Sequence, residues 1–417
     1  MSDSSVYRLD TLYQVTQALG TTLDLDALLN VVIDQVIAVT GAERGFLMLG
    51  EASTDMAIRV ARGMDRQTIE APEFQVSRGV VDRVATEGEP LLTSDAQSDA
   101  WLSERASVFD LKLRSIMCTP LQTQGVSIGL VYVDNRMHTG IFTEADLELL
   151  QAVANTAAVA IENARLHKLA IEQARMEQEL EVARQVQTSL IPLEAPKVRG
   201  FEISGVWRAA REVAGDFYDF IPRDNGQLAI VIGDVTDKGV PAAFFMALAR
   251  TTVRASIVGD VPGAAGLTQS NRLICADAAS GMFVTLYYLA LRPETPHVTC
   301  VSAGHNPPLW LHAKSGEISA LAGGSLPFGI DADQVYVEVS ETLEVNDSIL
   351  LYTDGIIDAM NERSEFFGLE RLMEAFRDHQ DASVEEMLNG VQGAVDAFAG
   401  DTPPFDDLTL VAVRYVG

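Results

Sequence analysis

Residues 228–235 read Leu-Ala-Ile-Val-Ile-Gly-Asp-Val, an apolar run followed by a glycine, an aspartate and a valine. Such a run is typical of a strand buried on both faces, and Asp234 stands at its end. Two other apolar runs have acidic residues at one end: residues 349–352 precede Asp354, and residues 408–413 follow Asp406 and Asp407. A fourth acidic signature, Gly-Asp-Phe-Tyr-Asp at residues 215–219, contains Asp216 and Asp219.

Carboxylates at the ends of buried strands can converge in space although they are far apart in the sequence. Carboxylate oxygens are the ligands that hard divalent cations prefer. A solvated turn would explain any one of these aspartates more simply, so the inference depends on the whole set. The set predicts an oxygen-rich metal site that needs neither histidine nor cysteine.

The composition limits the class of protein to which such a site could belong. The chain has 417 residues, 47% of them hydrophobic, which is enough for two or three domains with cores of their own. With 59 acidic against 30 basic residues, its formal net charge of −29 disfavours binding to nucleic acid or to anionic membranes. Three cysteines without a CxxC pair imply no disulfide framework. The polar N-terminus has no export signal and no apolar run is long enough to span a membrane, so we expect a cytoplasmic protein.

The pattern of elements predicts an α+β chain in three parts. Residues 1–165 mix helices and strands as an α/β domain, residues 166–195 form a helical linker, and residues 196–417 alternate strands with helix pairs as an antiparallel sandwich. In the last part, strands are expected at residues 203–207, 217–221, 228–233, 283–291, 297–303, 309–312, 336–339, 348–352 and 408–413.

The linker belongs to a helical pattern that runs from Thr143 to Pro192 without proline or glycine. In its second half, apolar residues alternate at spacings of four and three, with two glutamines in the same frame, which favours a short coiled coil and a homodimer. The alternative is a single helix packed on one of its own domains. The frame consists of Leu169, Gln173, Met176, Leu180, Ala183, Gln187 and Leu190.

Five motifs in residues 198–416, taken in order and spacing, resemble the metal-dependent PPM, or PP2C-like, serine/threonine phosphatases, and more closely their bacterial SpoIIE/RsbU branch. They are Gly-Asp-Phe-Tyr-Asp (215–219), Gly-Asp-Val-Thr-Asp-Lys-Gly-Val-Pro-Ala-Ala (233–243), Ala-Gly-His-Asn-Pro-Pro (303–308), Tyr-Thr-Asp-Gly-Ile-Ile-Asp-Ala (352–359) and Asp-Asp-Leu-Thr-Leu (406–410).

The resemblance implies two Mn²⁺ or Mg²⁺ ions and names their ligands. Asp234 would bridge the two ions, the backbone carbonyl of Val235 would complete one shell, and Asp216, Asp354 and Asp406 would supply the other carboxylates. Asp219 competes with Asp216 for its role, and Asp407 competes with Asp406. We prefer the first of each pair and keep Asp407 among the candidate ligands.

The same resemblance implies the chemistry. Asp234 and Asp354 would be the catalytic carboxylates, and a metal-bridged water would attack the phosphorus directly. The chain has no Cys-x5-Arg loop and no Walker-type loop, so no phospho-enzyme and no organic cofactor are expected.

Three other positions keep two interpretations each. His305 is either a proton donor to the leaving oxygen or the hydrogen-bonding residue of its own turn. Lys238 either contacts substrate phosphate or lies in a solvated turn, which we favour. Arg208 and Arg211 are weak candidates for holding phosphate.

The first 165 residues resemble a GAF domain, a sensory α/β module. The resemblance lies in residues 22–26, 40–45, 115–121, 128–135 and 142–146. It implies a fold and leaves open whether the domain binds a small-molecule ligand or only dimerises.

Together these resemblances imply a sensor, a helical transmitter and a phosphatase output. The expected substrate is a phosphoserine or phosphothreonine on a small bacterial regulatory protein, an anti-sigma-factor antagonist of a partner-switching pathway. Two alternatives remain: a non-catalytic signalling scaffold, and a phosphatase of small phosphorylated metabolites.

Overall fold

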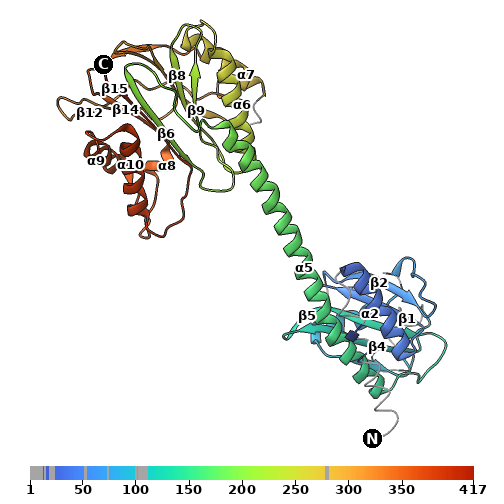
Figure 1. The fold of residues 1–417 in the computed structure, drawn as a ribbon. Helices are drawn as coiled ribbons and strands as arrows, with labels where there is room; N and C mark the ends of the chain where they lie inside the picture. The colour runs from blue at the N-terminus through green and yellow to red at the C-terminus, as the bar shows by residue number, and fades with distance from the viewer. Residues whose placement is uncertain are drawn as a thin grey trace. The chain divides into compact units, whose positions relative to one another are not determined.

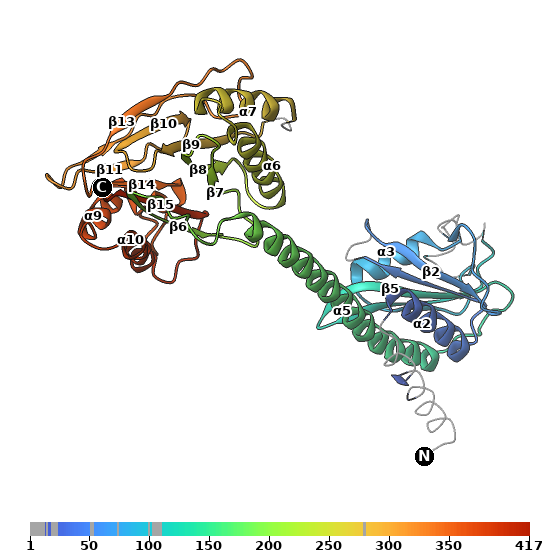
Figure 2. The ribbon, with the colours of Figure 1, turned by 45° about the horizontal axis from the view of Figure 1, so that its top comes forward.

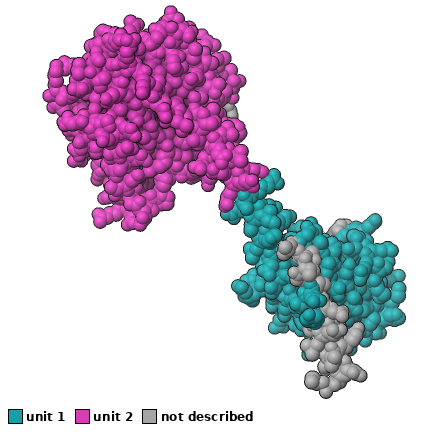
Figure 3. Space-filling view, in the orientation of Figure 1, with its two compact units in different colours: residues 1–176 teal, residues 177–417 magenta. Residues whose placement is uncertain are grey.

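The computed structural model describes residues 24–50, 54–72, 75–98, 111–277 and 281–417, together with residues 13, 16, 17 and 101. The chain divides into two compact units, residues 1–176 and residues 177–417, which Figure 3 shows in two colours.

Unit 1 is an antiparallel five-stranded sheet with helices on both faces (Figure 2). The strand order is β2-β1-β5-β4-β3. Side chains that alternate along a strand point to opposite faces, so Leu47 and Met117 pack with α2 and α5, whereas Phe46 and Cys118 pack with α3. This arrangement is the α/β domain expected from the sequence. Its elements are α2 (Leu25–Thr40), β1 (Arg44–Leu49), β2 (Ala57–Gly63), α3 (Arg78–Glu87), β3 (Leu91–Thr93), β4 (Ser115–Thr123) and β5 (Val126–Asn135).

Helix α5 (Glu144–Leu190) is 47 residues long. The backbone N–H and the hydroxyl of Thr143 both donate to the Asp146 carboxylate, at 2.9 and 2.7 Å, which caps the first turn. Its apolar side chains are buried in unit 1 as far as Ala164, whereas those of Leu169 and Met176 are 52% and 65% exposed. Length does not make α5 a membrane span: in the part of the chain that the structure describes, no helix is both long and apolar enough to cross a bilayer.

Unit 2 is a sandwich of two antiparallel five-stranded sheets, in the orders β13-β10-β9-β8-β7 and β12-β11-β14-β15-β6. Helices α6 and α7 lie beside the first sheet, and α9 and α10 beside the second (Figure 1). The elements are β6 (Phe201–Arg208), β7 (Phe217–Pro222), β8 (Leu228–Val235), α6 (Val240–Ile257), α7 (Gly263–Asp277), β9 (Val284–Leu291), β10 (His297–Ala303), β11 (Leu309–Leu311), β12 (Ile318–Ala320), β13 (Val339–Thr342), β14 (Ser348–Tyr352), α8 (Asp354–Ile357), α9 (Gly368–Asp378), α10 (Val384–Ala399) and β15 (Leu408–Tyr415).

Strand β14 shows how the two layers are filled. Ile349 and Leu351 belong to the core between the two sheets, whereas Leu350 and Tyr352 pack with the side chains of α9 and α10. The whole strand is therefore buried on both faces, as its continuous apolar sequence predicts.

The pairing of strands brings the acidic signatures to one edge of each sheet. In the first sheet, Phe217 at the start of β7 pairs with Gly233 near the end of β8. In the second, Tyr352 at the end of β14 pairs with Leu410 near the start of β15. Because neighbouring strands run antiparallel, the end of one strand and the beginning of the next meet at the same edge.

One strand prediction was wrong. Residues 336–339 were expected as a strand, but only Val339 belongs to one, β13. The backbone N–H of Tyr336 donates to the Thr268 hydroxyl at 3.2 Å, and its own hydroxyl donates to the Leu326 carbonyl at 2.9 Å. Tyr336 therefore anchors a loop, while the alternation of exposed valines around it only imitates a strand.

Candidate metal centre

Asp216 links the two sheets at the acidic edge of unit 2. Its side chain is 2% exposed, and its Oδ2 accepts hydrogen bonds from the hydroxyls of Thr353 and Thr409 at 2.6 and 2.8 Å. Thr353 directly follows β14 and Thr409 lies in β15, both of the second sheet, whereas Asp216 immediately precedes β7 of the first. Burial, and then the charge of Asp234, raise the pKa of Asp216 well above its usual range, against the effect of the two hydroxyls.

Asp234, near the end of β8, lies where the other acidic segments meet. Burial is the main cause that raises its pKa to about 7, followed by the charge of Asp354, while a hydrogen bond with the Asp216 carboxyl acts in the opposite direction. The charges of Asp406 and Asp407 raise it further. The raised pKa of Asp234 thus reflects burial first and neighbouring negative charge second.

Asp354 and Asp406 complete the cluster from the second sheet. Asp354 is the first residue of α8, directly after β14. Burial, and then the charge of Asp406, raise its pKa, and Lys238 opposes the shift. The Oδ1 of Asp406 accepts a hydrogen bond from the N–H of Asp407 at 2.9 Å, and its Oδ2 lies 2.9 Å from the Nζ of Lys238.

Two glycines allow these segments to approach each other. A Cβ added to Gly355 would overlap the carbonyl oxygen of Asp407 and would lie 3.2 Å from the Cβ of Asp406. A Cβ added to Gly215 would lie 3.1 Å from the carbonyl oxygen of Val235. The Val235 carbonyl therefore lies beside the Gly215-Asp216 segment, on the acidic side of β8.

The two competing aspartates have other partners. Asp219 is buried and its oxygens are bound by Arg254 at 2.7 and 2.8 Å and by Arg250 at 3.1 Å. Asp407 accepts hydrogen bonds from the backbone N–H groups of Ala210 and Gly215, at 2.8 and 2.7 Å. The two arginines take both oxygens of Asp219, which favours Asp216 of that pair as the metal ligand. Both oxygens of Asp406 also have partners, so the contacts do not separate Asp406 from Asp407.

His305 lies close to the cluster but has no free ring nitrogen. It is 5% exposed, its Nδ1 lies 2.8 Å from the Thr285 hydroxyl, and its Nε2 lies 3.1 Å from the Tyr352 carbonyl oxygen. Burial lowers its pKa to about 4, so at neutral pH Nε2–H donates to Tyr352 and Nδ1 accepts from Thr285. This geometry favours the structural interpretation of His305, as a bridge between β9 and β14.

A cavity of about 390 Å³ opens next to Asp406. Arg208 lies at this cavity, where it forms an ion pair with Asp396 at 2.8 Å, whereas Arg211 is exposed and does not line it. The rest of the lining combines the α8 segment with a proline-rich loop and α10; it includes Gly355, Met360, Val395, Pro403, Pro404, Phe405 and Leu408.

The donors suit a hard divalent cation, although they do not yet surround one point. Among the described residues, no three histidine, cysteine, aspartate or glutamate side chains already form a closed ion-binding group. Instead the carboxylates bind hydroxyls, a lysine and one another. All the candidate ligands are oxygen atoms. Burial, and then mutual repulsion, raise the pKa values of Asp216, Asp234 and Asp354, and a divalent cation would relieve the repulsion.

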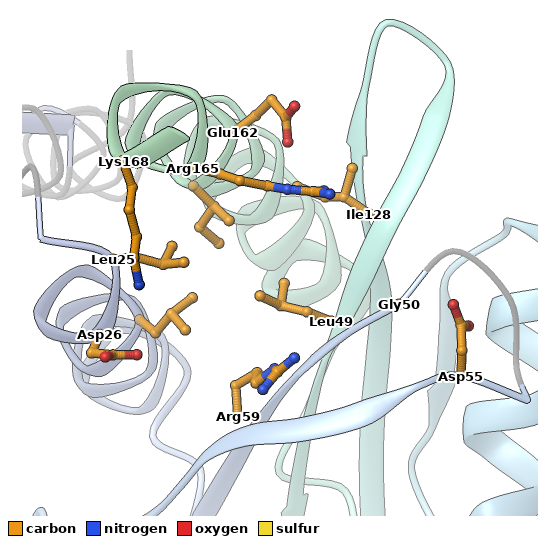
Figure 4. Close-up of a pocket in the computed structure, with 12 residues that line it drawn as sticks. Leu25, Asp26, Leu49, Gly50, Asp55, Arg59, Ile128, Glu162, Arg165 and Lys168 are labelled. Carbon is orange, nitrogen blue, oxygen red and sulfur yellow. The ribbon is translucent and has the colours of Figure 1, made fainter. Parts of the chain in front are cut away.

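Unit 1 has a cavity of its own, of about 530 Å³, between α2, α5 and the sheet (Figure 4). Its apolar lining includes Leu29, Leu49 and Ile161. Arg59, Arg165 and Lys168 also line it, and none of the three makes an ion pair with another residue that the structure describes. Asp26, Asp55 and Glu162 balance their charge, so the cavity shows no preference for one sign of ligand charge.

Comparisons with known proteins match the two units of the chain to two different families. Residues 224–416 match the family model described as Stage II sporulation protein E (SpoIIE), and residues 24–161 match that of the GAF domain. Protein IcfG of a Synechocystis strain is 29% identical over 56% of this chain and 41% of its own length. Phosphoserine phosphatase RsbU of Bacillus subtilis is 27% identical over 58% of this chain and 71% of its own length.

Among solved structures, the SiaA-PP2C domain of Pseudomonas aeruginosa matches with a TM-score of 0.52 and 22% identity. The match covers 59% of this chain and 99% of that domain. At this identity the likeness shows the fold alone, and that fold is the PP2C-like sandwich expected from the sequence.

Proposed function

We propose, from the premise that this chain joins a GAF domain to a SpoIIE/PP2C-type phosphatase domain, that it removes phosphate from serine or threonine in a regulatory protein. The observation that carries the proposal is the convergence of Asp216, Asp234, Asp354 and Asp406 from four separate segments. After burial, the charge of Asp234 is the next cause that raises the pKa of Asp216, that of Asp354 raises the pKa of Asp234, and that of Asp406 raises the pKa of Asp354. A structural role alone does not require so much uncompensated charge in one place.

Two Mn²⁺ or Mg²⁺ ions would be held by these four carboxylates and the Val235 carbonyl. When bound, they would supply a water of lowered pKa and neutralise charge on the phosphoryl group. Asp407 would hold the backbone next to Asp216 in place, because it accepts hydrogen bonds from the N–H groups of Ala210 and Gly215. Thr353 and Thr409 orient the Asp216 carboxylate.

The substrate would approach through the cavity beside Asp406. Its apolar lining from Met360, Pro404 and Phe405 is suited to residues that flank a phosphorylated side chain. Arg208 could turn from Asp396 to a phosphate oxygen there, since its present ion pair is partly exposed and therefore weak.

The partner is proposed from the likeness to phosphoserine phosphatase RsbU. A small phosphorylated regulatory protein, by the resemblance an anti-sigma-factor antagonist, would be the substrate in the cytoplasm. The chain spans only 41% and 71% of the two relatives described above, so this assignment rests on its phosphatase half.

Regulation is proposed to pass from residues 1–165 through residues 166–195 to the phosphatase domain at residues 196–417. The exposed apolar side chains of Leu166, Leu169 and Met176 on α5 support a homodimer formed through this linker. A small-molecule ligand of the GAF domain would act through the same helix.

The test is metal-dependent turnover by the purified full chain. With Mn²⁺ or Mg²⁺ it should hydrolyse p-nitrophenyl phosphate and a phosphoserine protein substrate, and a chelator should stop both reactions. Asp234→Ala and Asp354→Ala should each lower the rate by about a hundredfold or more, whereas Asp333→Ala, an exposed aspartate elsewhere in unit 2, should not. Activity that survives chelation would contradict the mechanism, and binding of the phosphoprotein without turnover would favour the scaffold.

A further inference from the structure

Lys238 lies in the turn between β8 and α6, and its side chain, 31% exposed, is bound at the edge of the acidic cluster. Its Nζ lies 2.9 Å from the Oδ2 of Asp406 and donates to the carbonyl oxygen of Phe405 at 2.7 Å. The same nitrogen lies 3.9 Å from the centre of the Phe405 ring. A carboxylate, a carbonyl and an aromatic face thus bind one ammonium group, as they would bind a small cation.

The backbone around Lys238 is shaped for this contact. Asp237 and Gly239 both have positive φ, at 70° and 79°, in the turn between β8 and α6. Just before them, the Thr236 hydroxyl exchanges hydrogen bonds with the backbone of Phe283, at 3.0 and 3.1 Å, which fixes the start of the turn. A left-handed non-glycine residue is unfavourable by itself, so the turn persists because its surroundings, including the Lys238 contacts, hold it.

The charge of Lys238 reaches beyond its ion pair. It opposes the raised pKa values of both Asp354 and Asp358. The ammonium therefore neutralises part of the negative charge that the proposed metal ions would neutralise. The ammonium lies next to Asp406, which, like Asp354, is a proposed ligand from the second sheet.

We propose that Lys238 is a built-in counter-ion that competes with one of the two divalent cations for Asp406. This inference rests on the proposed function. The ammonium lies 2.9 Å from the Oδ2 of Asp406, where it would repel a metal ion bound to the same carboxylate, so binding of that ion would weaken the contacts of Lys238 with Asp406 and Phe405. Lys238 then lowers the affinity for one ion, while the ion further from it binds as before. It also couples occupancy of the metal site to the loop that lines the neighbouring cavity.

The test is Mn²⁺ binding to the metal-stripped full chain, measured by titration calorimetry. Lys238→Gln removes the charge and should raise the affinity for the weaker ion by roughly tenfold or more, because a full charge within a few ångströms is lost. Lys238→Arg keeps the charge and should stay close to the wild type. Lys314→Gln is the matched control, since Lys314 also pairs with a carboxylate, Glu344 at 2.8 Å, but on the exposed surface of the same unit.

An affinity of Lys238→Gln equal to or below that of the wild type would overturn the inference and leave the proposed function standing. Absence of Mn²⁺ binding by the wild type would overturn both. Melting curves in chelator establish that each variant is folded. If Lys238→Gln fails this control, Lys238→Met, which keeps the apolar stem over Phe405, replaces it with the same expected gain in affinity.

Discussion

Asp234 carries part of the electrostatic cost of the metal-free site, together with Asp216 and Asp354. Its pKa is raised to about 7 in the folded state, against an ordinary value near 4 in the unfolded chain. A carboxyl group whose pKa is raised by folding binds its proton more tightly in the folded state. Below about pH 4 the group is protonated in both states and therefore does not lower the stability of the fold. The cost grows as the pH rises and is complete above about pH 7.

Asp234→Asn should therefore stabilise the metal-free protein at pH 8, by on the order of 3 kcal/mol, and change its stability little at pH 4.5. Urea denaturation of wild type and variant in chelator at the two pH values measures this. The difference between the two proteins is the quantity to compare, because His305 has a lowered pKa and contributes a trend of opposite sign to both. An equal difference at both pH values would contradict the raised pKa.

Asp406 and Asp407 are neighbours with different expected phenotypes. Asp407→Asn replaces one of the two acceptors for the N–H groups of Ala210 and Gly215 by a donor, so it should lower the free energy of unfolding by about 1–3 kcal/mol. Asp406→Asn breaks a partly exposed ion pair and should cost less than about 1 kcal/mol, but it should weaken Mn²⁺ binding. Denaturation in chelator and calorimetry with Mn²⁺ separate the two effects, and the reverse pattern would assign the ligand to Asp407.

At the scale of elements, the last turn of α5 touches the segment that carries Asp216. The side-chain amide of Gln187 is buried, donates to the carbonyl oxygen of Ala214 at 2.7 Å and accepts from its N–H at 2.8 Å. Ala214 is two residues before Asp216. A displacement of this end of α5 would therefore be felt at a proposed metal ligand.

Gln187→Met keeps the size of the side chain and removes both hydrogen bonds. We expect it to lower the phosphatase rate by about tenfold, since small misplacements of catalytic groups are costly, and to weaken Mn²⁺ binding. Gln185→Met is the matched control, because the Gln185 side chain, among the residues that the structure describes, bonds only to the exposed Glu181 of the same helix. Equal rates for the two variants would show that the Ala214 contact does not position Asp216.

Much of the element order could be predicted from the sequence, because long apolar runs and helical periodicity are local properties. The pairing of Asp219 with Arg250 and Arg254 could not, since it depends on how a later helix packs on β7. Nor could the contact of Lys238 be predicted, because its partner Asp406 lies much later in the sequence. Gln187 fits the heptad frame, yet it binds the backbone of Ala214 in unit 2. The spacing of residues in a heptad does not say which surface the helix contacts.

At the scale of the whole molecule, the exposed apolar side chains of Leu169 and Met176 on α5 predict self-association. The double variant Leu169→Glu and Met176→Glu places charge on two side chains that are 52% and 65% exposed. We expect the wild type to sediment as a dimer and this variant as a monomer, because like charges would face each other across the proposed coiled coil. Analytical ultracentrifugation measures the difference.

The control for this prediction is Leu193→Glu, the same kind of change at a leucine that is 90% exposed and lies beyond the end of α5. It should leave the association state unchanged. A wild-type monomer, or a double variant that remains dimeric, would place the contact between copies elsewhere.

Gly355 offers a simple test for relatives known only from their genomes. Any side chain at this position would collide with the Asp407 carbonyl group and crowd Asp406, so it would separate the two acidic segments of the second sheet. A homologue that retains every aspartate but has lost this glycine would be expected to have stopped working as a phosphatase. Substitution of Gly355 would then indicate the loss of activity while all the acidic residues are still present.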